Sequence, residues 1–203
     1  MKAEKFLDLP RPPKGKKGWP WKVAPDQFFE KQSDKKNWPK ISIVTPSFNQ
    51  GQFIEETIRS VLLQNYPSLE YIVIDGGSTD QSIEIIKKYS KWITYWVSEP
   101  DRGQSDALNK GFDLATGDIF GWLNSDDYFG KGALKNLMLL RADNTDCIAW
   151  IGACQIVDID GNPTKKMPLR TGSVRKISNW GKDAWFSQPS CLFDAQAFKK
   201  VGK

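Results

Sequence analysis

The chain has 203 residues, of which 39% are hydrophobic and 26% charged, a composition typical of one globular domain with a real core. No apolar stretch approaches the roughly 18 residues that span a bilayer, and the N-terminus lacks an apolar run of signal-peptide length, so we expect a cytoplasmic protein without membrane-spanning helices. There is no histidine, which excludes an imidazole base and the usual zinc ligand, so any catalysis must rest on carboxylates.

The first 40 residues carry the positive charge of the chain. They hold eleven Lys/Arg and five Asp/Glu, whereas the net charge of the whole chain is +5. This segment is rich in proline, which disfavours regular helices and central strands. We therefore expect residues 1–39 to form a basic N-terminal arm and residues 40–203 to form the folded domain. Lysines alternating with Trp19 and Trp21 predict a solvated arm, peripheral contact with the inner face of an anionic membrane, or contact with nucleic acid.

After the arm, short β-branched runs alternate with segments whose apolar residues recur at helical spacing. Turn-forming residues separate them, as at Asn65–Tyr66–Pro67 and Asp75–Gly76–Gly77. The alternation predicts right-handed crossovers and a mainly parallel α/β sheet with helices on both faces. The expected strands are Ile41–Pro46, Leu69–Ile74, Ile93–Val97 and Ile119–Leu123. One helix is expected to begin at Phe53 and a second to begin after a cap at Ser78 or Asp80. Two further helices are expected over Gln104–Leu114 and Lys131–Leu140.

The pattern changes beyond residue 148. Ala149–Asp158 followed by a turn at Asp160–Gly161–Asn162 predicts a small β-hairpin. An aromatic-rich stretch, Trp180–Phe186, comes after it. The expected fold is thus an α/β sheet with an added C-terminal hairpin and aromatic region.

Polar residues follow each of the four expected strands. Ligands of parallel sheets bind beyond the carboxyl ends of the strands, so we expect these segments to converge on one rim. The segments are Pro46–Ser47–Phe48–Asn49, Asp75–Gly76–Gly77–Ser78, Glu99–Pro100–Asp101–Arg102–Gly103 and Asn124–Ser125–Asp126–Asp127.

The acidic residues of this rim allow more than one interpretation. Adjacent Asp126 and Asp127 suit Mg²⁺ or Mn²⁺, which usually take one or two carboxylates, waters and phosphate oxygens. An isolated Asp–Asp pair more often caps a helix or solvates a turn. Asp75 can accept a hydrogen bond from a nucleobase N–H, or form an Asx turn with Gly76 and Gly77.

Four ordered motifs resemble those of glycosyltransferase family 2, whose fold is called GT-A and is Rossmann-like. The resemblance covers residues 40–135 and extends weakly to Gln188–Gly202. It implies that the chain transfers a sugar from a nucleotide-diphosphate sugar, with a UDP-sugar favoured as the donor. The acceptor is expected to be a hydroxyl of a glycan, a lipid or another molecule, as in polysaccharide biosynthesis. The resemblance also implies that the transfer inverts the sugar and depends on a metal. The motifs are Ile41–Gln50 (ISIVTPSFNQ), Tyr71–Asp80 (YIVIDGGSTD), Glu99–Gly111 (EPDRGQSDALNKG) and Gly117–Tyr128 (GDIFGWLNSDDY).

The resemblance also implies roles for single residues. Asp127 is expected to bind the metal, Mg²⁺ or Mn²⁺, with Asp126 beside it. Ser125 stands where a strict Asp-x-Asp motif has an aspartate, so the division of roles between the two aspartates stays open. The residues expected to contact the nucleotide sugar are Pro46, Ser47, Asn49, Asp75, Gly76, Ser78, Asp101, Arg102, Gly103, Asn109 and Asp126.

The motifs do not supply the base that takes the proton of the acceptor. In relatives it lies downstream of the stretch resembling Gln188–Gly202. Asp183 and Asp194 are the remaining candidates here, although each is also expected as a turn or helix-cap residue. One alternative is therefore a catalytically incomplete, nucleotide-sugar-binding part of a longer transferase.

Two further alternatives are weaker. A nucleotidyltransferase shares the sheet and the metal chemistry, but its usual glycine-rich loop after the first strand is absent. A nucleic-acid-binding protein is suggested by a pI of about 9.0 and nine tryptophans. Because the basic surplus lies outside the folded domain and the predicted rim is acidic, we expect no nucleic-acid partner.

Overall fold

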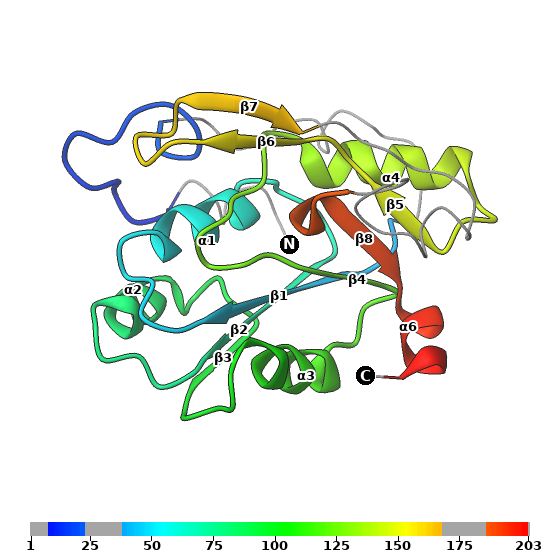
Figure 1. Cartoon of the computed structure of the whole chain (residues 1–203), viewed down its shortest axis with the longest axis horizontal. Coiled ribbons are helices and arrows are strands. Elements are labelled where there is room, and N and C mark those ends of the chain that lie inside the picture. The colour runs from blue at the N-terminus through cyan, green and yellow to red at the C-terminus, as the bar shows by residue number, and fades with distance from the viewer. Residues whose placement is uncertain (1–7, 23–37, 168–185, 203) are drawn as a thin grey trace.

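The computed structural model describes residues 8–22, 38–167 and 186–202 (Figure 1). Strands and helices alternate along the chain up to α4, as the sequence predicts. The strands are β1 (Ile41–Ser47), β2 (Leu69–Asp75), β3 (Tyr95–Ser98), β4 (Ile119–Trp122), β5 (Ala149–Ile151), β6 (Cys154–Val157), β7 (Pro163–Met167) and β8 (Cys191–Asp194). The helices are α1 (Ile54–Leu62), α2 (Ser82–Tyr89), α3 (Gln104–Leu114), α4 (Ala133–Asp143) and α6 (Ala195–Val201), and a 3-10 turn covers Gln188–Ser190.

Six strands form one mixed sheet in the order β3-β2-β1-β4-β8-β5. The first four are parallel to one another, and β8 is antiparallel to both β4 and β5. β1 is buried along its whole length, as expected for a central strand covered on both faces. The predicted α/β class with a mainly parallel sheet is confirmed.

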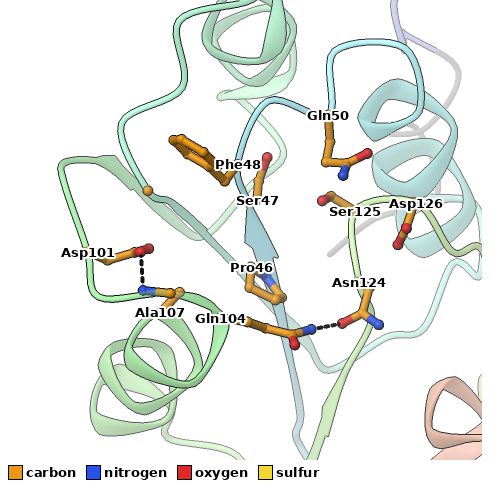
Figure 2. Close-up of a pocket in the computed structure, with 12 residues that line it drawn as sticks. Pro46, Ser47, Phe48, Gln50, Asp101, Gln104, Ala107, Asn124, Ser125 and Asp126 are labelled. Carbon is orange, nitrogen blue, oxygen red and sulfur yellow. Dashed lines mark hydrogen bonds between the residues drawn. The ribbon is translucent and has the colours of Figure 1, made fainter.

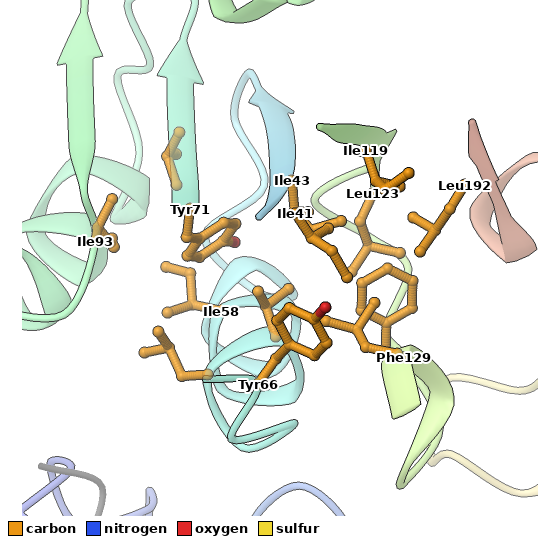
Figure 3. Packing of buried hydrophobic residues seen from close by; sticks show 14 of the residues in the cluster. Ile41, Ile43, Ile58, Tyr66, Tyr71, Ile93, Ile119, Leu123, Phe129 and Leu192 are labelled. Carbon is orange, nitrogen blue, oxygen red and sulfur yellow. The ribbon is translucent and has the colours of Figure 1, made fainter. Parts of the chain in front are cut away.

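Helices cover both faces of this sheet. One core lies between the sheet and helices α1, α2 and α4, and contains Ile43, Ile58 and Tyr71 (Figure 3). The second core lies between the sheet and helices α3 and α6. A Cβ atom on Gly111 would lie 2.4 Å from Cγ1 of Val44, so glycine is needed for α3 to pack this closely on β1. This close packing holds the later part of α3 against the middle of β1.

The C-terminal hairpin differs from its predicted bounds. β5, the first part of the expected hairpin strand, pairs with β8 in the main sheet. The hairpin is formed by β6 and β7, which pair with each other in a separate two-stranded sheet. A single apolar run therefore serves two sheets, which periodicity alone does not reveal. The predicted aromatic stretch lies mostly outside the described residues.

Of the two residues predicted to cap α2, Asp80 binds an amide of the first turn and Ser78 does not. The helix begins after Gln81, and no side chain caps it at that residue. Asp80 accepts a hydrogen bond from the amide of Ser82 at 2.9 Å, in the first turn. Ser78 has no such role, because its hydroxyl accepts from the Asn49 amide at 2.8 Å and donates to Asp75 at 2.5 Å.

Part of the basic arm is packed on the domain rather than solvated. The Trp21 side chain is buried, with 6% of its surface exposed, and Trp19 donates its indole N–H to the carbonyl of Phe129 at 2.7 Å. Arg59 of α1 donates to the carbonyls of Pro10 at 2.8 Å and Pro20 at 3.2 Å. The arm is therefore an ordered layer over α1 within residues 8–22. In the described parts of the chain, no helix has the length and apolarity needed to cross a membrane.

Candidate functional site

A cavity of about 510 Å³ lies beyond the carboxyl ends of β1 to β4 (Figure 2). This volume is in the usual range for small-molecule sites. Each of the four strand-end segments contributes to its wall, so the predicted convergence of these loops is observed. The cavity is lined by Pro46, Ser47, Phe48, Gln50, Gly76, Asp101, Gly103, Gln104, Ala107, Asn124, Ser125 and Asp126.

Six of the residues expected to contact a nucleotide sugar line this cavity. The other five are not among the lining residues, and some of them hold the loops of the cavity wall in place through hydrogen bonds. The six are Pro46, Ser47, Gly76, Asp101, Gly103 and Asp126, and the five are Asn49, Asp75, Ser78, Arg102 and Asn109.

Asp75 is fully buried and does not line the cavity. Its carboxylate accepts hydrogen bonds from the Ser78 amide at 2.9 Å, the Ser78 hydroxyl at 2.5 Å and the Ser98 hydroxyl at 2.7 Å. Three protein donors therefore occupy the group that was expected to contact a nucleobase. In this geometry Asp75 ties the end of β2 to β3 and to the following turn.

Asn49 and Ser78 connect the first two strand-end loops. Asn49 has a left-handed backbone (φ 52°), which asparagine tolerates better than most residues. Its amide donates to the Ser78 hydroxyl at 2.8 Å, and its side-chain carbonyl accepts from the Thr79 amide at 2.9 Å. These bonds shape the rim without presenting either side chain to the cavity.

The Arg102 side chain is exposed and forms a salt bridge with Asp106 at 3.1 Å on the outside of α3. Asn109 lies one turn further along this helix and is not among the lining residues. Asp101, in contrast, lines the cavity and accepts a hydrogen bond from the Gly103 amide at 2.8 Å. The loop before α3 thus presents one carboxylate to the cavity.

Asp126 and Asp127 occupy different surroundings. Asp126 lines the main cavity, whereas both aspartates border a second cavity of about 270 Å³. Asn124 donates to Asp127 at 3.3 Å. Burial raises the pKa of Asp127, and the negative charge of Asp126 raises this pKa further. The second cavity is lined by Phe53, Glu56, Thr57, Asp126, Asp127, Tyr128, Val157, Asp158, Ile159 and Gly161.

Helix α1 holds the aspartate loop in place. The Thr57 hydroxyl donates to the backbone carbonyls of Ser125 at 2.9 Å and Asp127 at 2.7 Å. Because both bonds reach backbone atoms, they fix the loop and leave the two carboxylates available. Two adjacent carboxylates suit a divalent cation chemically, since its positive charge offsets their repulsion. In the described residues no cluster of three His, Cys, Asp or Glu side chains could hold a metal, so water or phosphate must complete such a site.

Sequence reasoning missed six lining residues. Phe48, Asn124 and Ser125 stand in the strand-end segments, so their position was a sufficient signal. Gln104 is the first residue of α3 and donates to Asn124 at 2.6 Å. Its place directly after the loop that follows β3 could have identified it. We find no comparable signal for Gln50 or Ala107.

Of the two candidates for the base, Asp194 is described by the structure and is not among the residues that line the cavity. Asp194 caps α6, accepting a hydrogen bond from the Ala197 amide at 2.8 Å. It pairs with Ile119, the first residue of β4, and so lies at the opposite end of the strand from Asp126. Asp194 therefore serves as a helix cap, the other role expected for it, and does not line the main cavity. Asp183 lies outside the described residues.

The chain is similar to known glycosyltransferases in sequence and in fold. An uncharacterised glycosyltransferase of Mycobacterium tuberculosis is 41% identical over 92 residues, which is 45% of this chain and 35% of that protein. The Bacillus subtilis protein named for teichuronic acid biosynthesis, TuaG, is 33% identical over 134 residues, covering 64% and 53%. The chain therefore spans about half or less of the length of these relatives.

A solved structure and a family model agree with these relatives. The mannosyltransferase PcManGT from Pyrobaculum calidifontis, solved with GDP-Man and Mn²⁺, has a TM-score of 0.59 and 23% identity, covering 98% of this chain and 52% of that one. The model of glycosyl transferase family 2 matches residues 42–202. This match includes all four strand-end loops and the main sheet. The chain belongs to glycosyltransferase family 2.

Proposed function

We propose that the chain binds a nucleoside-diphosphate sugar and Mg²⁺ or Mn²⁺ in the main cavity. It takes part in transferring that sugar, with inversion, to a hydroxyl of a glycan or lipid-linked acceptor. The acceptor is at the cytoplasmic face of a membrane. One observation carries the proposal. In a chain of this family, Asp126 borders a cavity to which all four strand-end loops contribute. The metal and the nucleotide sugar of PcManGT are consistent with this donor class.

The cavity has two chemically different sides, which suggest how the donor lies. Phe48 and Asp101 are on one side, and Asn124 and Asp126 are on the other (Figure 2). Phe48 is 58% exposed, so its ring is available to a planar base. Asp101 can only accept hydrogen bonds when ionised. We place the base beside Phe48 and Asp101, and the diphosphate beside Asp126.

This placement favours uracil or guanine over cytosine. Uracil and guanine each carry a ring N–H that a carboxylate can accept, whereas the corresponding ring nitrogen of cytosine is itself an acceptor. The proposal therefore includes UDP-sugars, which the sequence motifs favour, and GDP-sugars; thymine has the same ring N–H as uracil, so this criterion also admits dTDP-sugars. Asp101 takes the part that we expected from Asp75.

The other side suits a diphosphate. Asp126 and Asp127 hold the cation, which when bound neutralises charge on the leaving diphosphate. The first amides of α3, after Gly103, lie at a helix N-terminus, where unpaired N–H groups favour anions. The Gln104–Asn124 hydrogen bond braces this side of the cavity.

A second candidate function is donor binding without complete catalytic machinery. The observation that favours it is the location of Asp194 at the far end of β4. Asp194 is the one described residue that the sequence singled out as a base, and it does not lie beside the cavity. In that case the chain binds the donor and hydrolyses it slowly, and transfer requires a base from another segment.

The proposal is tested by thermal unfolding with UDP-, GDP-, CDP- and dTDP-sugars, with and without Mn²⁺. We expect UDP- or GDP-sugars to raise the melting temperature only with the metal, and CDP-sugars to raise it less. Phe48→Ala should weaken binding about tenfold, and Phe48→Trp should retain it, because base stacking contributes about 1–3 kcal/mol. If no nucleotide sugar stabilises the chain in Mn²⁺, the proposed function is wrong.

A further inference from the structure

The N-terminal segment Asp8–Lys22, here called the docked arm, is held at a fixed place on the domain. Two cations lie over the ring of Trp21, with the Lys16 ammonium 5.1 Å and the Arg59 guanidinium 5.5 Å from its centroid. Arg59 is buried and also donates to the carbonyls of Pro10 and Pro20. The docked arm precedes residue 42, where the family match begins, so its presence is a feature of this chain beyond the family motifs.

The docked arm presents a dense positive charge to solvent. It contains five Lys/Arg and one Asp, and its four lysines and Arg11 are all exposed. None of these cations takes part in a salt bridge with another described residue, whereas Lys40, Lys88 and Lys110 on the domain are each paired with a carboxylate. An exposed, unpaired cluster of this kind attracts anionic surfaces.

The shape and the aromatic residues of the docked arm restrict the partner. The five cations of the docked arm are all exposed, and none of them lines either of the two cavities described above. This exposure fits an open charged surface better than a pocket for one anion. Pro20 and Trp21 are buried, and the Trp19 indole N–H is bound to Phe129. Trp21 is thus unavailable for stacking on single-stranded nucleic acid or for insertion into a bilayer.

We propose that the docked arm is an electrostatic contact surface for an anionic lipid bilayer, and that the folded domain holds it in position through Arg59 and Trp21. A bilayer presents many weak anionic sites in one plane, which matches an open cluster of lysines. The choice of a bilayer rests on the proposed function, in which the acceptor is at a membrane. Binding is expected to depend on salt and not on insertion of Trp21, because this side chain is buried against the domain.

The test is co-sedimentation of the full chain with vesicles of phosphatidylcholine, with and without about one third phosphatidylglycerol, at low and high salt. The arm variant is Lys14→Ser/Lys17→Ser/Lys22→Ser, which retains Lys16 on Trp21. A matched control, Lys87→Ser/Lys131→Ser/Lys200→Ser, removes the same charge from exposed sites on α2, before α4 and on α6. We expect the arm variant to bind anionic vesicles at least tenfold more weakly and the control less than twofold more weakly.

Three outcomes would overturn this proposal. These are an absence of binding to anionic vesicles at low salt, equal loss in the arm and control variants, and binding that high salt does not reverse. A stronger effect of the arm lysines on a single-stranded oligonucleotide than on vesicles would assign the surface to nucleic acid instead. Donor binding, measured by thermal unfolding, should be the same in all three proteins, so failure here is distinguishable from failure of the proposed function.

Discussion

Single side chains decide how the predicted strands are joined, and Glu70 is the clearest case. It accepts hydrogen bonds from Lys40 at 2.6 Å, from the Ser42 hydroxyl at 2.5 Å, and from the amide and hydroxyl of Thr116 at 2.7 Å. Burial acts to raise its pKa, but these four donors outweigh burial and lower the pKa to about 2. Glu70 therefore links β2 to β1 and to the loop before β4.

Glu70→Gln is expected to lower the free energy of unfolding at pH 7, by about 3 kcal/mol at most, because a shift of one pKa unit corresponds to about 1.4 kcal/mol. The folded-state pKa is below the ordinary value of 4.5, so this stability is present above about pH 4.5 and is lost as the pH falls toward 2. Urea unfolding at pH 7 and pH 3 should show the difference between the two proteins shrinking by about half. If the difference in the free energy of unfolding between the two proteins does not change with pH, the lowered pKa of Glu70 is contradicted.

At the same scale, the sequence predicts which residue types meet but not where each side chain points. Asp75 and Asp101 both follow strands, and both were expected beside the donor. Only Asp101 faces the cavity, because Ser78 and Ser98 bind the carboxylate of Asp75. Two serines at the right distance are enough to turn a carboxylate inward, and their effect depends on the register between β2 and β3.

At the scale of elements, local patterns predict the βα units well and the arm poorly. The four parallel strands and their helices carry strong apolar periodicity, and their bounds agree to within a few residues. The arm has no periodicity, and its order comes from tertiary contacts with α1 that local sequence does not record. For a related reason, the sequence pattern predicts β5 and β6 as one strand, because only the fold assigns them to different sheets.

Arg59 is the contact on which the docked arm depends. Arg59→Ala should lower the free energy of unfolding by about 2–4 kcal/mol, because it leaves the carbonyls of Pro10 and Pro20 and the Tyr89 hydroxyl without their donor. Arg59→Lys should be intermediate, since a lysine cannot reproduce the planar fork of donors. Limited trypsin digestion should cut the arm faster in the alanine variant than in Glu84→Ala, an exposed control on α2. Unchanged protection would show that other contacts hold the arm.

At the scale of the whole molecule, topology places the site. Four parallel strands end at one edge, so loops from residues 46 to 127 meet in one cavity, and this could be predicted from element order alone. The position of Asp127 at the second cavity and of Asp126 at both cavities could not be predicted, because it depends on how α1 and the β6–β7 hairpin pack around their loop. The proton acceptor could not be predicted either, since Asp194 lies at the opposite end of β4.

The most direct test of the donor site is calorimetric titration of the chain with a UDP- or GDP-sugar in Mn²⁺ and in EDTA. Asp127→Asn is compared with Asp146→Asn, an exposed control beyond α4. We expect binding in Mn²⁺ that is lost in EDTA, weakened about 10- to 100-fold by Asp127→Asn, in line with about 1–3 kcal/mol for a charge-assisted contact, and unchanged by Asp146→Asn. Equal affinity in EDTA and Mn²⁺, or full affinity in Asp127→Asn, would contradict a metal-bridged donor at this rim.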